Sequence, residues 1–217
     1  MFEEFVKKLS AEIKKDLPGF SAQKLMAPLG RTPPGEYLKE NVVPKKSAVL
    51  ILLYPDVRKF SPKTVLILRP ENEGGNHAGQ VSFPGGGYDD SDIDLSETAL
   101  RETEEEIGVN RRSVSLLGAL TPLYIPVSNY LVHPFVGICH IKPVFKIQPL
   151  EVEDLLECDA EEFLSPKNKS AILKHIKVKN KKMKVPCYHI NGKIIWGATA
   201  MIIAELEEII KRIVTER

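Results

Sequence analysis

The chain lacks most features of secreted, disulfide-rich and membrane-spanning proteins. Its three cysteines, Cys139, Cys158 and Cys187, include no C-x-x-C pair, so the sequence favours neither a disulfide framework nor a structural zinc site. Apolar runs such as AVLILLY and AMIIA are far too short to cross a bilayer. The opening stretch MFEEFVKKLSAEIKKDLPG is charged throughout and contains no apolar signal core. We therefore expect a cytoplasmic protein with reduced cysteines and no membrane partner.

A strong net charge is also missing. Thirty Lys and Arg residues oppose 29 Asp and Glu residues, which gives a net charge of +1 at pH 7. This balance offers no electrostatic argument for nucleic-acid binding, and we expect no nucleic-acid partner. One local exception, the basic stretch KHIKVKNKKMKV, either contacts phosphates or keeps a sheet edge solvated and away from other chains.

Several well-known metal and nucleotide motifs are absent. No lysine follows the triple glycine at P-loop spacing, and these glycines lack the G-x-G-x-x-G register of a dinucleotide fold. The sequence has neither a G-x-S-x-G elbow nor an H-E-x-x-H pair. Asp90, Asp92 and Asp94 begin like a calcium-binding EF-hand loop. However, Leu95 stands where that loop requires Gly, and Arg101 stands where it requires Glu.

Apolar periodicity divides the chain into two parts. Residues 2–17 carry apolar side chains at helical spacing, and Pro18 with Gly19 ends the pattern. The prolines between residues 18 and 44 indicate an irregular connector. We therefore predict an N-terminal amphipathic helix and Pro-rich connector over residues 1–42, followed by one main domain over residues 43–217.

The main domain alternates predicted strands with predicted helices. Turn-bounded apolar or β-branched runs predict strands at residues 47–54, 64–69, 80–83, 114–120, 129–140, 145–150, 184–190 and 193–197. Asn191-Gly192 predicts a hairpin turn between the last two strands. Residues 95–107 and 198–214 have helical periodicity. This order predicts an α/β fold with a mixed sheet covered by helices.

The predicted helix over residues 95–107 is rich in glutamate. Asp94 followed by Glu97 resembles a capping box. At about 100° per residue, Glu102, Glu105 and Glu106 share an arc beside the apolar face. Like-charged neighbours at this spacing repel, and burial raises their pKa values unless a cation compensates. Such oxygen clusters bind Mg²⁺ or Mn²⁺, although a solvated acidic face with Lys and Arg partners is the alternative.

The loop before this helix fits a close ligand. Pro84 and the three glycines that follow leave backbone amides and carbonyls accessible, because no side chains cover them. Arg101 lies just outside the carboxylate arc, where its guanidinium can hold one of the glutamates.

The stretch GYDDSDIDLSETALRETEEEIGV resembles a Nudix box, G-x5-E-x7-R-E-U-x-E-E-x-G-U, in which U is a bulky apolar residue. The matching positions are Gly87, Arg101, Glu102, Glu105, Glu106, Gly108 and Val109. The first glutamate of the box falls on Ile93, and Thr103 occupies an apolar position. Asp90, Asp92 and Asp94 are candidates to replace the missing acid, and we expect Asp92.

The resemblance extends to the coenzyme A pyrophosphatase-like Nudix hydrolases through HAGQVSFPGG, YLVHPFVG and WGATAMI. These relatives carry an Arg shortly before the His-x-Gly-Gln segment, where this chain has Gly74 and Gly75. The resemblance implies a Nudix-type α/β/α sandwich. It also implies hydrolysis of coenzyme A or acyl-coenzyme A to 3′,5′-ADP and (acyl-)4′-phosphopantetheine. The alternatives are a diphosphatase for ADP-ribose or a dinucleotide, and a non-catalytic nucleotide-binding module, which the Ile93 departure alone favours.

Residue roles follow from the resemblance. It implies that Glu102, Glu105, Glu106 and the Gly86 carbonyl bind Mg²⁺ or Mn²⁺, and that Arg101 orients a glutamate by an ion pair. Glu105 is the nearest candidate for the catalytic base. Three acidic residues later in the chain are further candidates for the base: Glu151, Glu153 and Asp154. The alternative is that they only form a turn before a solvated helix. The predicted substrate contacts are Arg69, His77, Gln80, Ser82, Gly85, Gly86 and Tyr130, with Ser128 beside them. The sequence leaves open whether the protein forms a homodimer.

Overall fold

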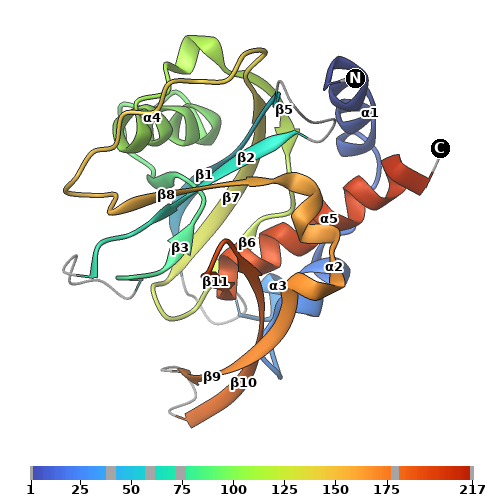
Figure 1. Cartoon of the computed structure of the whole chain (residues 1–217). Coiled ribbons are helices and arrows are strands. Elements are labelled where there is room, and N and C mark those ends of the chain that lie inside the picture. Colours follow the sequence, from blue (N-terminus) through green and yellow to red (C-terminus); the bar gives the residue numbers. More distant parts are fainter. Residues whose placement is uncertain (1, 38–42, 57–61, 72–76, 177–180, 216–217) are drawn as a thin grey trace.

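The computed structural model describes residues 2–37, 43–56, 62–71, 77–176 and 181–215 (Figure 1). Its centre is an eight-stranded sheet in the order β3-β2-β1-β7-β5, with β4 and β6 paired to β1 and β7 and with β8 paired to β2. Only β1 and β7 among the paired strands are parallel, so the sheet is mixed. The strands are β1 Lys45–Tyr54, β2 Lys63–Leu68, β3 Val81–Ser82, β4 Gly85–Gly87, β5 Ser115–Ala119, β6 Leu123–Ile125, β7 Tyr130–Ile138 and β8 Asp154–Asp159.

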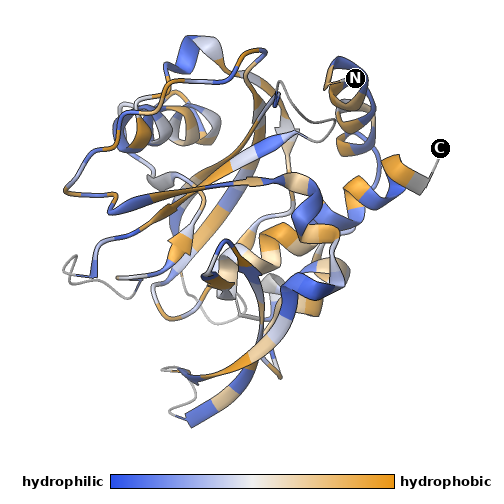
Figure 2. Cartoon of the chain, in the orientation of Figure 1, coloured by the Kyte–Doolittle hydropathy of each residue, from blue (hydrophilic) through white to orange (hydrophobic). Residues whose placement is uncertain are grey.

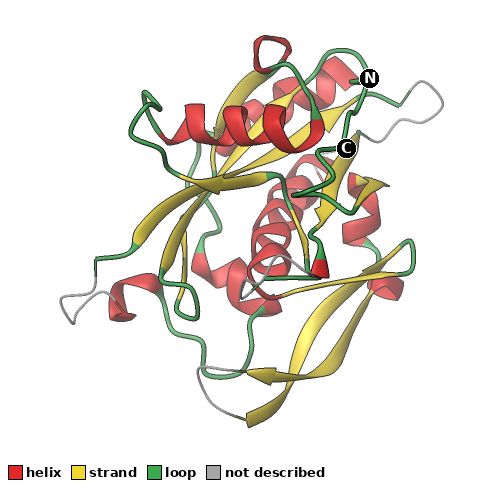
Figure 3. Cartoon of the chain, turned by 90° about the vertical axis from the view of Figure 1, so that its left-hand side faces the viewer, coloured by secondary structure: helices red, strands yellow, loops and turns green. Residues whose placement is uncertain are grey.

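Strand β1 shows why helices cover both faces of the sheet. Successive side chains of a strand project to opposite faces, and β1 is apolar at nearly every position. Leu50 and Leu52 pack under helix α4 (Leu95–Ile107), while Ile51 and Leu53 belong to the cluster that contains α1 (Phe2–Ile13) and α5 (Gly197–Thr215). The result is the predicted α/β/α sandwich, with α4 on one side and α1 and α5 on the other (Figures 1 and 3).

The N-terminal segment shares the core of the main domain. Helix α1 ends at Ile13, before the predicted end at Leu17, and its apolar face packs on α5. Short helices follow it: α2 Phe20–Gln23, η1 Lys24–Met26 and α3 Pro34–Tyr37. The buried carboxylate of Glu205 accepts hydrogen bonds from the Gly19 amide (3.0 Å) and the Gln23 side chain (2.9 Å). These bonds connect the segment to α5, while a domain boundary at residue 42 stays a prediction.

A second, three-stranded antiparallel sheet lies beside α5, in the order β11-β10-β9. Its strands are β9 Lys169–Ile176, β10 Lys181–Ile190 and β11 Lys193–Trp196. The predicted turn at Asn191-Gly192 is confirmed, with φ of 46° and 77° as tight hairpin turns require. The far end of β9 and β10 projects from the main body (Figures 1 and 2), and Lys181, Lys182 and Lys184 are exposed there.

Two predictions about the loop after β7 are wrong. Residues 145–150 form no strand, because the Lys146 and Gln148 amides donate to the Ile107 and Glu106 carbonyls (2.9 Å each) and so complete the end of α4. The turn at residues 150–153 leads into β8, not into a helix. The short helices η3 Arg111–Ser113, η4 Ala160–Leu164 and η5 Pro166–Asn168 complete the fold.

The structure bears on two further points raised by composition. All three cysteines are free and buried, as predicted. Across the parts of the chain that the structure describes, no helix is long and apolar enough to span a membrane.

Candidate active site

Helix α4 begins and ends where the sequence predicts. The Asp94 carboxylate accepts from the amides of Ser96 (2.8 Å) and Glu97 (3.0 Å), a cap that stabilises a helix by about 1 kcal/mol. Gly108 adopts a left-handed conformation (φ 71°), and its amide donates to the Glu104 carbonyl. The expected capping box is only half present, because the Glu97 carboxylate pairs with Arg111 (2.7 Å) and not with the Asp94 amide.

Arg101 is the centre of a network of carboxylates. Its guanidinium donates to both Asp92 oxygens (2.8 and 3.0 Å), to Glu102 (2.8 Å) and to Glu105 (3.1 Å). The same group donates to the Gly87 carbonyl (3.1 Å), which connects the helix to β4. One arginine therefore fixes the loop, the strand and two glutamates of the helix relative to one another.

Asp92 is the loop acid that the structure places on Arg101. Its side chain is buried and also accepts from the Thr98 hydroxyl (2.7 Å) and the Asp89 amide (3.1 Å). These donors, with the Arg101 guanidinium foremost, hold the pKa of the Asp92 carboxyl well below its usual range. Ile93, at the position of the box glutamate, is 87% exposed. Its neighbour Asp94 is occupied by the helix cap.

Glu106 lies in a different environment at the other end of the helix. It is 1% exposed, and its carboxylate accepts from the Gly85 amide (2.8 Å) and lies 3.4 Å from Arg69. Burial raises the pKa of Glu106 to about 8; Gly85 and Arg69 oppose this rise, while Glu102 and Glu151 add to it. The predicted substrate contact Arg69 is therefore engaged with a predicted metal ligand.

Glu102 packs directly against the glycine strand β4. A Cβ atom added at Gly86 would lie 2.4 Å from a Glu102 carboxylate oxygen, so a side chain there would force the Glu102 carboxylate to move. Burial also raises the pKa of Glu102, and the nearby Arg101 counteracts it. Gly85 is more strongly constrained, because its φ of 149° and the Ala48 carbonyl leave no room for a side chain.

Glu151 joins this cluster from a distant part of the chain. Its charge raises the pKa values of both Glu102 and Glu106, which places its carboxylate near theirs. The adjacent Val152 is 1% exposed and belongs to the cluster under α4, so it fixes the turn. Asp154, by contrast, begins β8 and lies 3.8 Å from Lys193. The carboxylates are neighbours but do not converge: in the described ranges, no three His, Cys, Asp or Glu side chains form a ready ligand set.

The other predicted substrate contacts fall into two groups. The His77 ring lies between the Gln80 side chain (3.3 Å) and the Ser128 hydroxyl (3.1 Å), and these bonds join the turn before β3 to the turn before β7. Ser82 is on β3, and its hydroxyl has no hydrogen-bond partner among the described residues. Tyr130 lines a separate pocket. Gly74 and Gly75 lie outside the described residues.

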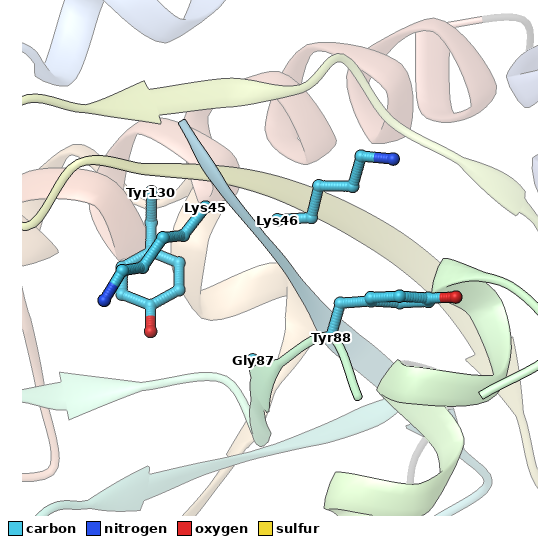
Figure 4. A pocket seen from close by; sticks show the side chains of 5 residues that line it. All are labelled: Lys45, Lys46, Gly87, Tyr88 and Tyr130. Carbon is cyan, nitrogen blue, oxygen red and sulfur yellow. The ribbon is translucent and has the colours of Figure 1, made fainter. Parts of the chain in front are cut away.

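The pocket beside Tyr130 has a volume of about 410 Å³ and is lined by Lys45, Lys46, Gly87, Tyr88 and Tyr130 (Figure 4). Sequence reasoning identified only Tyr130 and Gly87 from this set. The lysines begin β1 and read locally as a polar strand end, and the register that pairs Lys45 with Tyr130 is a tertiary feature.

The sequence of this chain matches a family model and several known proteins. The family model described as NUDIX domain matches residues 44–176. The uncharacterized Nudix hydrolase NudL of Photorhabdus laumondii is 35% identical over 176 residues, which cover 81% of this chain and 89% of that protein. NudL of Yersinia pestis is 37% identical over 164 residues, which cover 76% and 79%. A solved Nudix hydrolase of M. smegmatis, RenU, has a TM-score of 0.52 at 13% identity, covering 78% of this chain and 87% of that one.

The chain therefore belongs to the Nudix hydrolase family. This membership confirms the predicted Nudix fold and the prediction that the protein is an enzyme, a hydrolase of phosphorus anhydrides. Nudix hydrolases generally use divalent metal ions. The substrate, the metal and the roles of single residues are matters of proposal.

Proposed function

We propose that this protein is a Mg²⁺- or Mn²⁺-dependent diphosphatase that cleaves coenzyme A or acyl-coenzyme A into 3′,5′-ADP and (acyl-)4′-phosphopantetheine. The observation that carries the proposal is the group of carboxylates that Arg101 holds against the glycine strand, at Glu102 and Glu105. The coenzyme A assignment is supported by the three sequence segments that resemble that subfamily. ADP-ribose and dinucleotides are the runner-up substrates.

The donor set suits a hard divalent cation. Glu102, Glu105 and Glu106 offer carboxylate oxygens, and Gly86 offers a backbone carbonyl beside them, which are the ligands that Mg²⁺ and Mn²⁺ prefer. Burial raises the pKa values of Glu102 and Glu106, so their ionised forms are disfavoured in the absence of a cation. A bound cation would favour the ionised forms, so the residues present fit the metal. When bound, the cation neutralises charge on the diphosphate oxygens and lowers the pKa of the attacking water.

The protein's own groups then position the glutamates and deprotonate the attacking water. Arg101 is held by Asp92 and donates hydrogen bonds to Glu102 and Glu105, so it fixes both glutamates. The Gly85 amide fixes Glu106. The base must lie within reach of the water and of solvent. Glu105 satisfies this requirement because its side chain is half exposed. Glu151, on the turn beside the cluster, is the second candidate for the base.

The two candidate bases are distinguishable by matched variants. Glu151→Gln is compared with Glu153→Gln, because both residues are exposed and lie in the same turn. If Glu151 is the base, its variant lowers kcat by about 100-fold or more and flattens the acid limb of the pH–rate profile, while Glu153→Gln changes neither. Equal behaviour of the two variants leaves Glu105 as the base.

The proposed function is tested with a substrate panel. Coenzyme A, ADP-ribose, dinucleotides and nucleoside triphosphates are each incubated with Mg²⁺ or Mn²⁺, and products are identified by mass. The proposal predicts 3′,5′-ADP and 4′-phosphopantetheine from coenzyme A, and no product when the metal is chelated. Faster cleavage of another substrate would retain the diphosphatase chemistry and refute the coenzyme A assignment. Ligand binding without cleavage would indicate a nucleotide-binding module.

A further inference from the structure

The pocket beside the carboxylate cluster combines positive charge with aromatic surface. Lys45 and Lys46 begin β1, Gly87 and Tyr88 end β4, and Tyr130 begins β7. Figure 4 shows Lys45 and Tyr130 on one side of β1, with Lys46 and Tyr88 on the other. The pocket is large enough, at about 410 Å³, for a nucleoside-sized group.

The two lysines give this pocket a positive charge. In the part of the chain that the structure describes, neither Lys45 nor Lys46 has a carboxylate partner, and both side chains are exposed. Burial lowers the pKa of the neighbouring His133, and the Lys46 ammonium lowers it further. Two unpaired ammonium groups at one strand end favour an anionic ligand, since charge-assisted hydrogen bonds are the strong ones.

Aromatic and hydroxyl groups give the pocket further ligand-binding chemistry. The Lys45 ammonium lies 5.9 Å from the centroid of the Tyr130 ring, so charge and ring face the same space.

The pocket shares one residue with the hydrogen-bond network around Arg101. Gly87 lines the pocket, and the Gly87 carbonyl accepts a hydrogen bond from Arg101 (3.1 Å). The Tyr88 hydroxyl donates to the Asp92 carbonyl (3.2 Å), which ties the second aromatic wall to the same network. A diphosphate held at Glu102 and Gly86 would therefore place one of its two substituents in this pocket.

We propose that this pocket binds the nucleoside end of the substrate, with the ribose phosphomonoester on one of the two lysines, which lie on opposite sides of β1, and the base on a tyrosine ring. The inference rests on the proposed function and adds the reason for its substrate preference. Substrates with a phosphomonoester on the ribose, such as coenzyme A, gain an interaction that ADP-ribose and simple dinucleotides cannot make.

The test compares ligands that differ only in the phosphomonoester. Calorimetry measures binding of 3′,5′-ADP and of 5′-AMP to the wild type, to the double variant Lys45→Ala/Lys46→Ala, and to Lys174→Ala. Lys174 is the matched control, because its ammonium lies 5.1 Å from the Trp196 ring in the other sheet. We expect the wild type and Lys174→Ala to bind 3′,5′-ADP at least about tenfold more tightly than 5′-AMP, and the double variant to lose that preference.

Catalysis gives an independent second measurement, the ratio of kcat/KM for coenzyme A to that for dephospho-coenzyme A. The inference predicts a ratio above about ten in the wild type that falls toward one in the double variant. A double variant that keeps the preference, or one that weakens both ligands equally, would overturn the inference. Equal cleavage of both substrates by the wild type would overturn it and leave the proposed function intact. A 3′-phosphate binding preference without any cleavage would support the pocket and refute the proposed function.

Discussion

Asp92 and Glu106 are buried carboxylates near the two ends of helix α4, yet their charges are compensated differently. Asp92 has both its oxygens on Arg101 and two further donors, and its pKa is low. Glu106 has one amide and an arginine at 3.4 Å, with Glu102 and Glu151 nearby, and its pKa is about 8. The first end of the helix is thus electrostatically complete within the protein, whereas the second is the end at which we propose that a cation binds.

The largest expected effect concerns the carboxylates of the proposed metal site near the C-terminal end of α4. Glu105→Gln should lower kcat by about 100-fold or more, because it removes a metal ligand or base. Its melting temperature should stay close to that of the wild type, since the side chain is half exposed. Glu104→Gln is the control, because Glu104 lies one residue away but pairs with Arg111 (2.7 Å). Full turnover by Glu105→Gln would refute the assignment of this site.

A mutation of Asp92, near the N-terminal end of α4, should mainly change the stability of the protein. Asp92→Asn removes a charge from the bidentate contact with Arg101 and should lower the free energy of unfolding by about 2 kcal/mol. Because Arg101 also orients Glu102 and Glu105, metal affinity should weaken as well. Denaturant unfolding and a Mg²⁺ or Mn²⁺ titration measure the two effects. A variant with unchanged metal titration would contradict the positioning role of Asp92.

The pH dependence of stability separates the two carboxylates further. The pKa of Glu106 is raised from 4.5 to about 8 by folding, so the folded state binds this proton more tightly than the unfolded state. Its contribution to stability is fully present below the unfolded pKa and is lost as pH rises through about 8. In a chelator-containing buffer, Glu106→Gln should therefore melt at a higher temperature than the wild type at pH 8.5, but not at pH 4. A constant difference across this range would contradict the raised pKa.

The smallest expected effect is at the position that the family pattern assigns to an acid. Ile93 is 87% exposed and Arg101 is already occupied by Asp92, so Ile93→Glu should change stability by no more than about 0.5 kcal/mol. Its kcat should also stay within about twofold of the wild type. A large gain in activity would show that Asp92 does not replace the box glutamate.

Local signals in the sequence were sufficient for helix α4 and its glutamate arc. The cap at Asp94, the periodicity of residues 95–107 and the glycine at 108 each depend on near neighbours in the chain, and the structure matches them. The fold class was equally accessible, because β1 carries an unbroken apolar run from Ala48 to Tyr54. Asp92 was selected from three aspartates, and only the contact with Arg101 distinguishes it in the structure.

Features that depend on distant segments could not be predicted. The alternation in residues 145–150 resembles a strand, but their amides complete the C-terminal end of α4. Strand β4 consists of three glycines, which have a low intrinsic strand preference, and it forms because β1 offers a pairing edge. Lys45 lies opposite Tyr130 only through the parallel register of β1 and β7.

The most direct test of the account is the number of protons released when Mn²⁺ binds at the proposed metal site, which includes Glu106. Calorimetric titrations at pH 7 in buffers of different ionisation enthalpy give this number. Because the pKa of Glu106 is about 8, the carboxyl is largely protonated at pH 7, and binding should release close to one proton. The release should fall toward zero above about pH 9 and disappear in Glu106→Gln. Mn²⁺ binding without proton release at pH 7, or no Mn²⁺ binding at all, would contradict the account.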